Sequence, residues 1–281
     1  MGVVLRLLKQ LVAVVAVAFA GGMVVGAVQG NAPLTLLLGL ATAALAVFVY
    51  ARVVRWSERR PPVEVAAKGA AAATGRGVLI GVGMFAAVIV NIAFLGGYRI
   101  EGLGSVWGAV GLFGIMAAAA VTEELLFRGV LFRIVEELTG TWVALTLTGV
   151  LFGLVHLSNP NASLWGAICI AISAGGMLAA AYAATRTLWL PIGLHFGWNF
   201  AAAGIFGTEV SGNGTPQGLL DGVTSGPALL TGGAFGPEGS LYTVVFGVLL
   251  TIAFIWLARR RGNLVPLRRS ARAGATATLS Q

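Results

Sequence analysis

Residues 105–127, SVWGAVGLFGIMAAAAVTEELLF, decide the fold, because an apolar run long enough to cross a bilayer ends in two adjacent glutamates. A helix of about 20 apolar residues spans a hydrocarbon core of roughly 30 Å. The whole chain has this character: 58% of its 281 residues are hydrophobic and 10% are charged, which excludes a soluble globular protein. Strand-like alternation is absent, so the sequence predicts an all-α, polytopic membrane helical bundle and not a β-barrel.

Eight apolar stretches are candidate transmembrane helices. They are residues 10–30, 33–53, 77–97, 105–127, 141–157, 164–184, 187–206 and 241–258. The chain accordingly divides into five parts: N-terminal transmembrane helices (1–104), a core that contains the polar motifs (105–206), a flexible external loop rich in glycine and proline (207–240), a last transmembrane helix (241–258) and a basic cytoplasmic tail (259–281).

Lysines and arginines cluster beside the ends of the predicted spans. With the N-terminus in the cytoplasm, every lysine and arginine except Arg99 falls on the cytoplasmic side. This satisfies the positive-inside rule. We therefore expect a multi-pass protein of the cell (plasma) membrane with both termini in the cytoplasm. Orientation and contact with membrane lipid account for the net charge of +8, so no nucleic-acid partner is expected. The sequence does not indicate an oligomeric state.

Three short segments hold most of the polar residues that fall within apolar stretches. They are residues 123–128 (EELLFR), 152–156 (FGLVH) and 195–199 (HFGWN). An ionisable group at membrane depth is costly, so each segment is a candidate functional site. Residues four apart share one face of a helix, whereas neighbours diverge by about 100°. Glu124 can therefore pair with Arg128, while Glu123 is free to face a cavity.

The second and third segments repeat the four-residue spacing, in Phe152 with His156 and in His195 with Asn199. A histidine and an asparagine on one face offer two hydrogen-bond donors, which suits the binding of an oxyanion. Each segment alone also fits a structural role. The glutamates could form the solvated end of a span, and the other residues could form polar contacts between helices.

The spacing along the chain brings the segments to one depth. Glu123 lies about 16 residues before the turn near 139–140 and His156 about 16 after it, so an antiparallel helix pair places them level. His195 lies on a span that runs parallel to the His156 helix and can reach the same level. Three segments that meet at one depth favour a functional site over scattered structural polar residues.

In this order, the patterns Glu-Glu-x-x-x-Arg, Phe-x-x-x-His and His-x-x-x-Asn resemble the CPBP intramembrane proteases. This family includes the Rce1-type CAAX prenyl endopeptidases and bacterial bacteriocin-processing or immunity proteins. The resemblance spans about residues 123–199 and leaves out the first three helices and the tail. It implies an eight-helix bundle around a polar cavity, with 105–206 as the catalytic core. The implied activity is hydrolysis of a membrane-associated or lipidated peptide, with access from the cytoplasmic side.

The resemblance also implies roles for single residues. Glu123 would be the general base, and His156 would help to orient and activate the water. His195 and Asn199 would stabilise the tetrahedral oxyanion. Glu124, Arg128 and Phe152 would support the shape of the site.

A metal is an open alternative at this stage. Glu123, His156 and His195 could supply three zinc ligands and leave one position for water. However, the chain lacks His-Glu-x-x-His, and Asn199 is a poor zinc ligand. We therefore favour a site without metal or other cofactor.

Two other functions stay open beside a peptidase. One is a non-proteolytic immunity or binding scaffold with the same fold. The other is a small proton-coupled transporter that uses the carboxylate and histidines as a proton relay. The presence of all the motif residues favours the peptidase.

Overall fold

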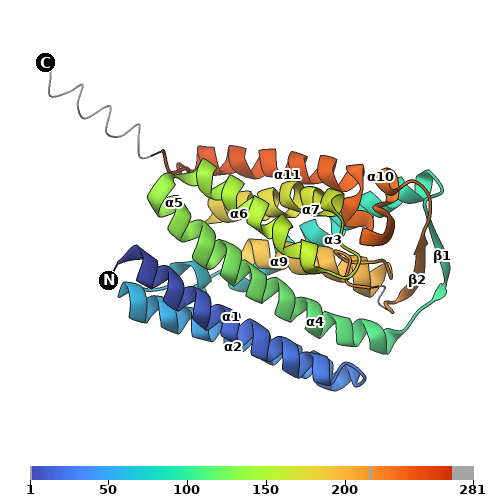
Figure 1. Cartoon of the computed structure of the whole chain (residues 1–281), viewed down its shortest axis with the longest axis horizontal. Helices are drawn as coiled ribbons and strands as arrows, with labels where there is room; N and C mark the ends of the chain where they lie inside the picture. The colour runs from blue at the N-terminus through green and yellow to red at the C-terminus, as the bar shows by residue number, and fades with distance from the viewer. Residues whose placement is uncertain (1, 215–216, 268–281) are drawn as a thin grey trace, which may run out of the picture.

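Long helices that run side by side make up most of the molecule (Figure 1). The computed structural model describes residues 2–214 and 217–267, so most of the predicted tail lies outside the described residues. The α-helices longer than a single turn are α1 (Val3–Ala27), α2 (Ala32–Glu58), α3 (Ala70–Phe94), α4 (Val106–Glu124), α5 (Arg133–Thr139), α6 (Thr141–Val155), α7 (Leu164–Ile170), α8 (Met177–Thr185), α9 (Trp189–Asn199) and α11 (Leu241–Arg260).

Three π-helical stretches join or extend these helices without a break. They are η2 (Leu125–Phe132) between α4 and α5, η4 (Ala171–Gly176) between α7 and α8, and η5 (Phe200–Ile205) after α9. The remaining helical segments are single turns: η1 (Val63–Val65), η3 (His156–Ser158), α10 (Ala228–Thr231), η6 (Gly233–Phe235) and η7 (Pro237–Gly239).

The structure confirms the predicted all-α polytopic membrane bundle, with 76% of the chain in helices. Within residues 2–214 and 217–267, seven helical segments are long and apolar enough to cross a membrane: 3–27, 32–58, 70–94, 106–139, 141–158, 164–185 and 241–260. The predicted span at 187–206 is helical from Trp189 to Ile205 but is shorter than these seven. The count of eight is therefore not confirmed.

The helix α9 lies against α3 at backbone contact distance. A Cβ atom added to Gly81 of α3 would lie 2.3 Å from the carbonyl oxygen of Leu194, and one added to Gly197 of α9 would lie 2.5 Å from that of Val78. Gly77 and Gly193 make the same kind of contact one turn away. Glycines let two membrane helices approach this closely. The contact fixes the depth and rotation of α9, which carries His195 and Asn199.

A small antiparallel sheet closes the end of the bundle that lies away from the start of α1 and the end of α11 (Figure 1). Strand β1 (Tyr98–Leu103) pairs with β2 (Leu220–Thr224), so that Tyr98 lies opposite Thr224 and Leu103 opposite Leu220. The sequence predicted only a loop at 207–240. The structure instead gives this segment a strand, short helical turns and buried side chains such as Phe235 and Glu238. We call residues 207–214 and 217–240 the cap.

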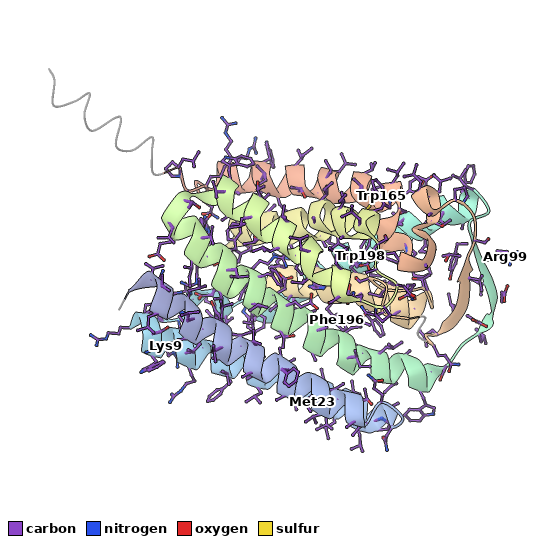
Figure 2. All side chains as sticks on the ribbon, viewed as in Figure 1. Lys9, Met23, Arg99, Trp165, Phe196 and Trp198 are labelled. Carbon is purple, nitrogen blue, oxygen red and sulfur yellow. The ribbon has the colours of Figure 1, made fainter. Side chains whose placement is uncertain are left out.

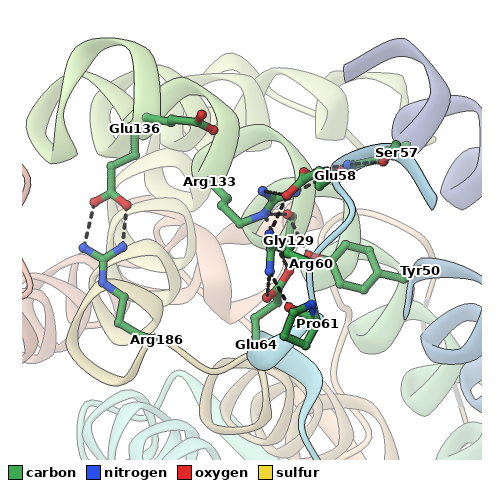
Figure 3. A network of polar contacts seen from close by, with 12 residues as sticks. Tyr50, Ser57, Glu58, Arg60, Pro61, Glu64, Gly129, Arg133, Glu136 and Arg186 are labelled. Carbon is green, nitrogen blue, oxygen red and sulfur yellow. Dashed lines mark hydrogen bonds and ion pairs between the residues drawn. The ribbon is translucent and has the colours of Figure 1, made fainter. Parts of the chain in front are cut away.

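A network of buried charges holds the opposite end together (Figure 3). Arg133 of α5 donates to both carboxylate oxygens of Glu58 at the end of α2, at 2.9 and 2.6 Å. Arg60 donates to both oxygens of Glu64 at 2.9 Å, and the Tyr50 hydroxyl donates to Glu64 at 2.5 Å. Burial raises the pKa of Glu64, but the hydrogen bonds from Arg60 and Tyr50 outweigh burial and hold this pKa below its ordinary value of 4.5.

The Arg133–Glu58 pair yields a test of stability. We expect Arg133→Ala to lower the unfolding free energy by about 3 kcal/mol, because it leaves a buried carboxylate without its main partner. Thermal unfolding of the purified protein in detergent measures this effect. Arg55→Ala, at an exposed position on α2, is the matched control and should change stability by less than about 0.5 kcal/mol. Equal unfolding midpoints for the two variants would contradict the role of the network.

Glu64 yields a pH dependence. Because its pKa is lowered in the folded state, it stabilises the fold above pH 4.5, and this contribution is lost as the pH falls through the lowered value. Glu64→Gln should therefore unfold at a lower temperature than the parent protein at neutral pH. The difference in unfolding temperature between the variant and the parent protein should become steadily smaller below pH 4.5. A difference that stays constant from neutral pH into acid would refute this assignment.

Candidate active site

The three polar segments meet inside the bundle. Glu123 near the end of α4, His156 after α6, and His195 and Asn199 of α9 all line one cavity of about 1040 Å³. The structure thus brings together the three residues that the depth estimate placed level with one another, Glu123, His156 and His195, and Asn199 lines the same cavity. The turn at Thr139–Gly140 folds α6 back along α5 and η2, and Glu123 and His156 line the same cavity.

The two adjacent glutamates have different surroundings. The side chain of Glu123 is 34% exposed and faces the cavity, whereas that of Glu124 is fully buried. One oxygen of Glu124, Oε1, accepts hydrogen bonds from Arg128 at 2.8 Å and from Nδ1 of His195 at 2.9 Å. The sequence predicted the pair with Arg128. It did not predict the bond to His195, which lies 71 residues away.

Arg128 is buried beneath the site, with a side chain 1% exposed. It donates to the carbonyl oxygens of Ala174 and Gly175 in η4, at 3.2 and 3.1 Å. Its guanidinium lies 4.6 Å from the centre of the Phe152 ring. All three π-helical stretches are therefore close to the site: η2 follows Glu124, η4 accepts the hydrogen bonds of Arg128, and η5 follows Asn199. Short π-helical turns are frequent at functional sites.

Phe152 separates the guanidinium from the two imidazoles. Its ring centre lies 4.9 Å from that of His156 and 5.9 Å from that of His195, and it packs edge-on against Phe127. The cation–π contact between Arg128 and Phe152 adds to the stabilisation of the buried guanidinium. Phe152 thus contacts Arg128 and both histidines, and its role in supporting the site, which the family resemblance implies, stays a prediction.

The hydrogen-bond partner of each histidine indicates which ring nitrogen carries the hydrogen. Nδ1 of His156 lies 2.6 Å from the carbonyl oxygen of Phe152, and Nδ1 of His195 faces the carboxylate of Glu124. Carbonyl and carboxylate oxygens only accept, so each Nδ1 carries the hydrogen and each Nε2 of the neutral ring has a free lone pair. For His195, this Nε2 lies 3.8 Å from Oε2 of Glu123. A carboxylate and an imidazole nitrogen therefore face each other in the cavity.

The sequence missed one polar group beside the site. Glu238 of the cap is buried and accepts hydrogen bonds from the indole of Trp198 at 2.7 Å and from the backbone N–H and hydroxyl of Ser211 at 2.5 and 2.6 Å. Ser211 and Glu238 also line a second cavity of about 20 Å³, next to His156, His195 and Asn199. This volume is large enough for one water molecule. Nothing in the Gly-rich sequence around Glu238 indicated that this residue would lie beside the site.

The residues of the site do not fit a zinc centre. Among residues 2–214 and 217–267, no three His, Cys, Asp or Glu side chains converge closely enough to hold a metal ion. Glu123, His156 and His195 line the same cavity but do not form such a group. No step of the mechanism below is therefore assigned to a metal.

Comparison with known proteins agrees with the motifs. Residues 105–201 match the family model described as type II CAAX prenyl endopeptidase Rce1-like, which confirms the resemblance to the CPBP proteases. The match contains all three polar segments. No curated protein matches the chain, and no solved structure matches it. The family implies a peptidase, and its match together with the long apolar helices supports an integral membrane protein.

The different surroundings of the two glutamates can be tested without a substrate. Glu124→Gln should lower the unfolding free energy by about 3 kcal/mol or more, because it leaves the buried Arg128 charge uncompensated. Glu123→Gln should change it by less than about 0.5 kcal/mol, because this side chain is partly exposed to the cavity. Thermal unfolding in detergent measures both. If Glu123→Gln proved the more destabilising of the two, the assignment of roles would be wrong.

Proposed function

We propose that this chain, an integral membrane protein whose residues 105–201 match the Rce1-like endopeptidases, is an intramembrane endopeptidase that hydrolyses a peptide bond with water activated by Glu123. Its substrate is a membrane-associated or lipidated peptide. One observation carries the proposal: the Glu123 carboxylate and the Nε2 atom of His195 face each other across 3.8 Å at the wall of a large cavity. The protein works in the plasma membrane with both termini in the cytoplasm.

The geometry supports a defined position for the attacking water. A water oxygen about 2.8 Å from both Oε2 of Glu123 and Nε2 of His195 donates one hydrogen to each, because both atoms are acceptors. The oxygen lone pairs then point away from the two side chains, toward a substrate carbonyl in the cavity. When the C–O bond forms, Glu123 takes the proton from the water. It later gives this proton to the leaving amine as the C–N bond breaks.

Other residues hold the reacting groups. Glu124 fixes the tautomer and orientation of His195 through Nδ1, as a carboxylate does for many catalytic histidines. This tautomer favours water orientation by His195, where the family resemblance implied oxyanion binding. The Asn199 amide then supplies the N–H that stabilises the oxyanion. His156 lines the same cavity, and its Nδ1 donates to the carbonyl oxygen of Phe152.

Loss of the Glu123 carboxylate is the central test of this mechanism. We expect Glu123→Gln to reduce peptide hydrolysis by roughly 10²-fold or more, because a glutamine cannot accept the proton of the water. New peptide termini in membranes that contain the parent protein or the variant, compared by mass spectrometry, measure the effect. Glu101→Gln, on the exposed strand β1, is the control that should retain full cleavage.

The same comparison separates the rival functions. A binding scaffold would keep its phenotype in the Glu123→Gln variant, and a proton-coupled transporter would lose coupling without any new termini in either form. Cleavage should persist when the membranes are treated with a strong metal chelator. Cleavage abolished by chelator and restored by zinc would contradict activation of water by Glu123 and His195 alone.

A further inference from the structure

The cavity of the site has its mouth at one end of the bundle. Away from Glu123, its walls are formed by Gln29 in the connection between α1 and α2, by Trp107 at the start of α4, and by Asn213 and Gln217 of the cap. These segments lie at the end that carries β1 and β2, away from the start of α1 (Figure 1). Arg99, which the sequence placed outside, belongs to this same end (Figure 2).

The basic residues gather at the opposite end. Lys9 lies there, near the start of α1 (Figure 2), and a separate recess at this end is lined by Arg6, Lys9, Arg59, Arg60, Arg133 and Arg186. The end of a membrane protein that is rich in lysine and arginine faces the cytoplasm. The cavity of the site therefore opens away from the cytoplasm, in contrast to the cytoplasmic access that the family resemblance implied.

The walls of the cavity also limit what can bind. Among the described residues that line it, Glu123 is the only one with a carboxylate, and none is a lysine or arginine. Leu112, Ile115 and Met116 of α4 form an apolar wall between the mouth and Glu123. A substrate carboxylate near the reacting bond would be desolvated without a cation to pair with. Arg128 cannot serve, because it is buried and bonded to Glu124.

We propose that the site takes an uncharged, apolar segment of a peptide that reaches it from the extracytoplasmic side, and that it cuts this segment internally without binding a C-terminal carboxylate. The proposal rests on the peptidase function proposed above and names its substrate class. It places the reaction on exported or membrane-anchored peptides.

The side of access can be tested without any substrate. Cys169 is the only cysteine and is buried, so Cys169→Ala gives a background for single cysteines. Asn213→Cys probes the mouth, Ala119→Cys probes the cavity one turn before Glu123, and Lys68→Cys probes the basic end. Intact cells are treated with a charged, membrane-impermeant thiol reagent, before and after permeabilisation.

We expect the reagent to label Asn213→Cys and Ala119→Cys in intact cells. Lys68→Cys should be labelled only after permeabilisation. The reverse pattern, with Lys68→Cys labelled in intact cells and the cavity positions protected, would overturn extracytoplasmic access. Protection of Ala119→Cys in both conditions, with Asn213→Cys labelled, would show that the cavity is closed to the outside and would also overturn it.

The substrate class requires a second measurement. Purified protein in detergent is incubated with a pool of apolar peptides without charged side chains, each made with a free C-terminal carboxylate and as the amide. We expect both forms to be cut at the same internal bonds, at comparable rates, with loss of cleavage in Glu123→Gln. Cleavage of the free acids alone, at a fixed distance from the C-terminus, would overturn the proposed class. Cleavage of neither form would contradict the peptidase function, and the labelling would still decide the side of access.

Discussion

The buried carboxylate of Glu124 is the interaction on which the site depends. One of its oxygens bonds both Arg128 and Nδ1 of His195, so a single charge compensates a guanidinium beneath the site and orients an imidazole that lines the cavity. Burial of such a cation without a partner would cost several kcal/mol. Because Glu124 meets this structural need, the neighbouring carboxylate of Glu123 remains free to face the cavity and to take part in chemistry.

Helix packing determines whether these side chains can meet. The backbone contact between α3 and α9 at Gly81 and Gly197 leaves no room for a Cβ atom, so α9 can hold His195 at one depth only. From the other side, Glu238 of the cap binds Trp198, which lies between His195 and Asn199 on the same helix. The cap thus positions α9 in addition to closing the end of the bundle. Mobility of α9 would separate His195 from Glu124 and from Glu123 together.

The sequence predicted much of this arrangement, since it depends on local rules. The composition and the lengths of the apolar stretches predicted the helical bundle, and the four-residue spacing predicted the Glu124–Arg128 pair. The similar number of residues between each of them and the turn predicted that Glu123 and His156 lie at the same depth. The bond from His195 to Glu124 and the contacts of Glu238 could not be predicted, because they depend on helix rotation and on the path of a Gly-rich segment. The side on which the cavity opens likewise follows only from packing.

A single turnover in water enriched with ¹⁸O tests the central claim most directly. If Glu123 acts as a general base, the attacking oxygen comes from the solvent, so the new C-terminal carboxylate of the product carries ¹⁸O after the first turnover. The side chain of Glu123 stays unlabelled. If the carboxylate of Glu123 attacks the substrate itself and water then cleaves the resulting anhydride at the Glu123 carbonyl carbon, the first product takes its oxygen from the protein and ¹⁸O enters Glu123. Label in Glu123 would contradict the mechanism proposed for this site.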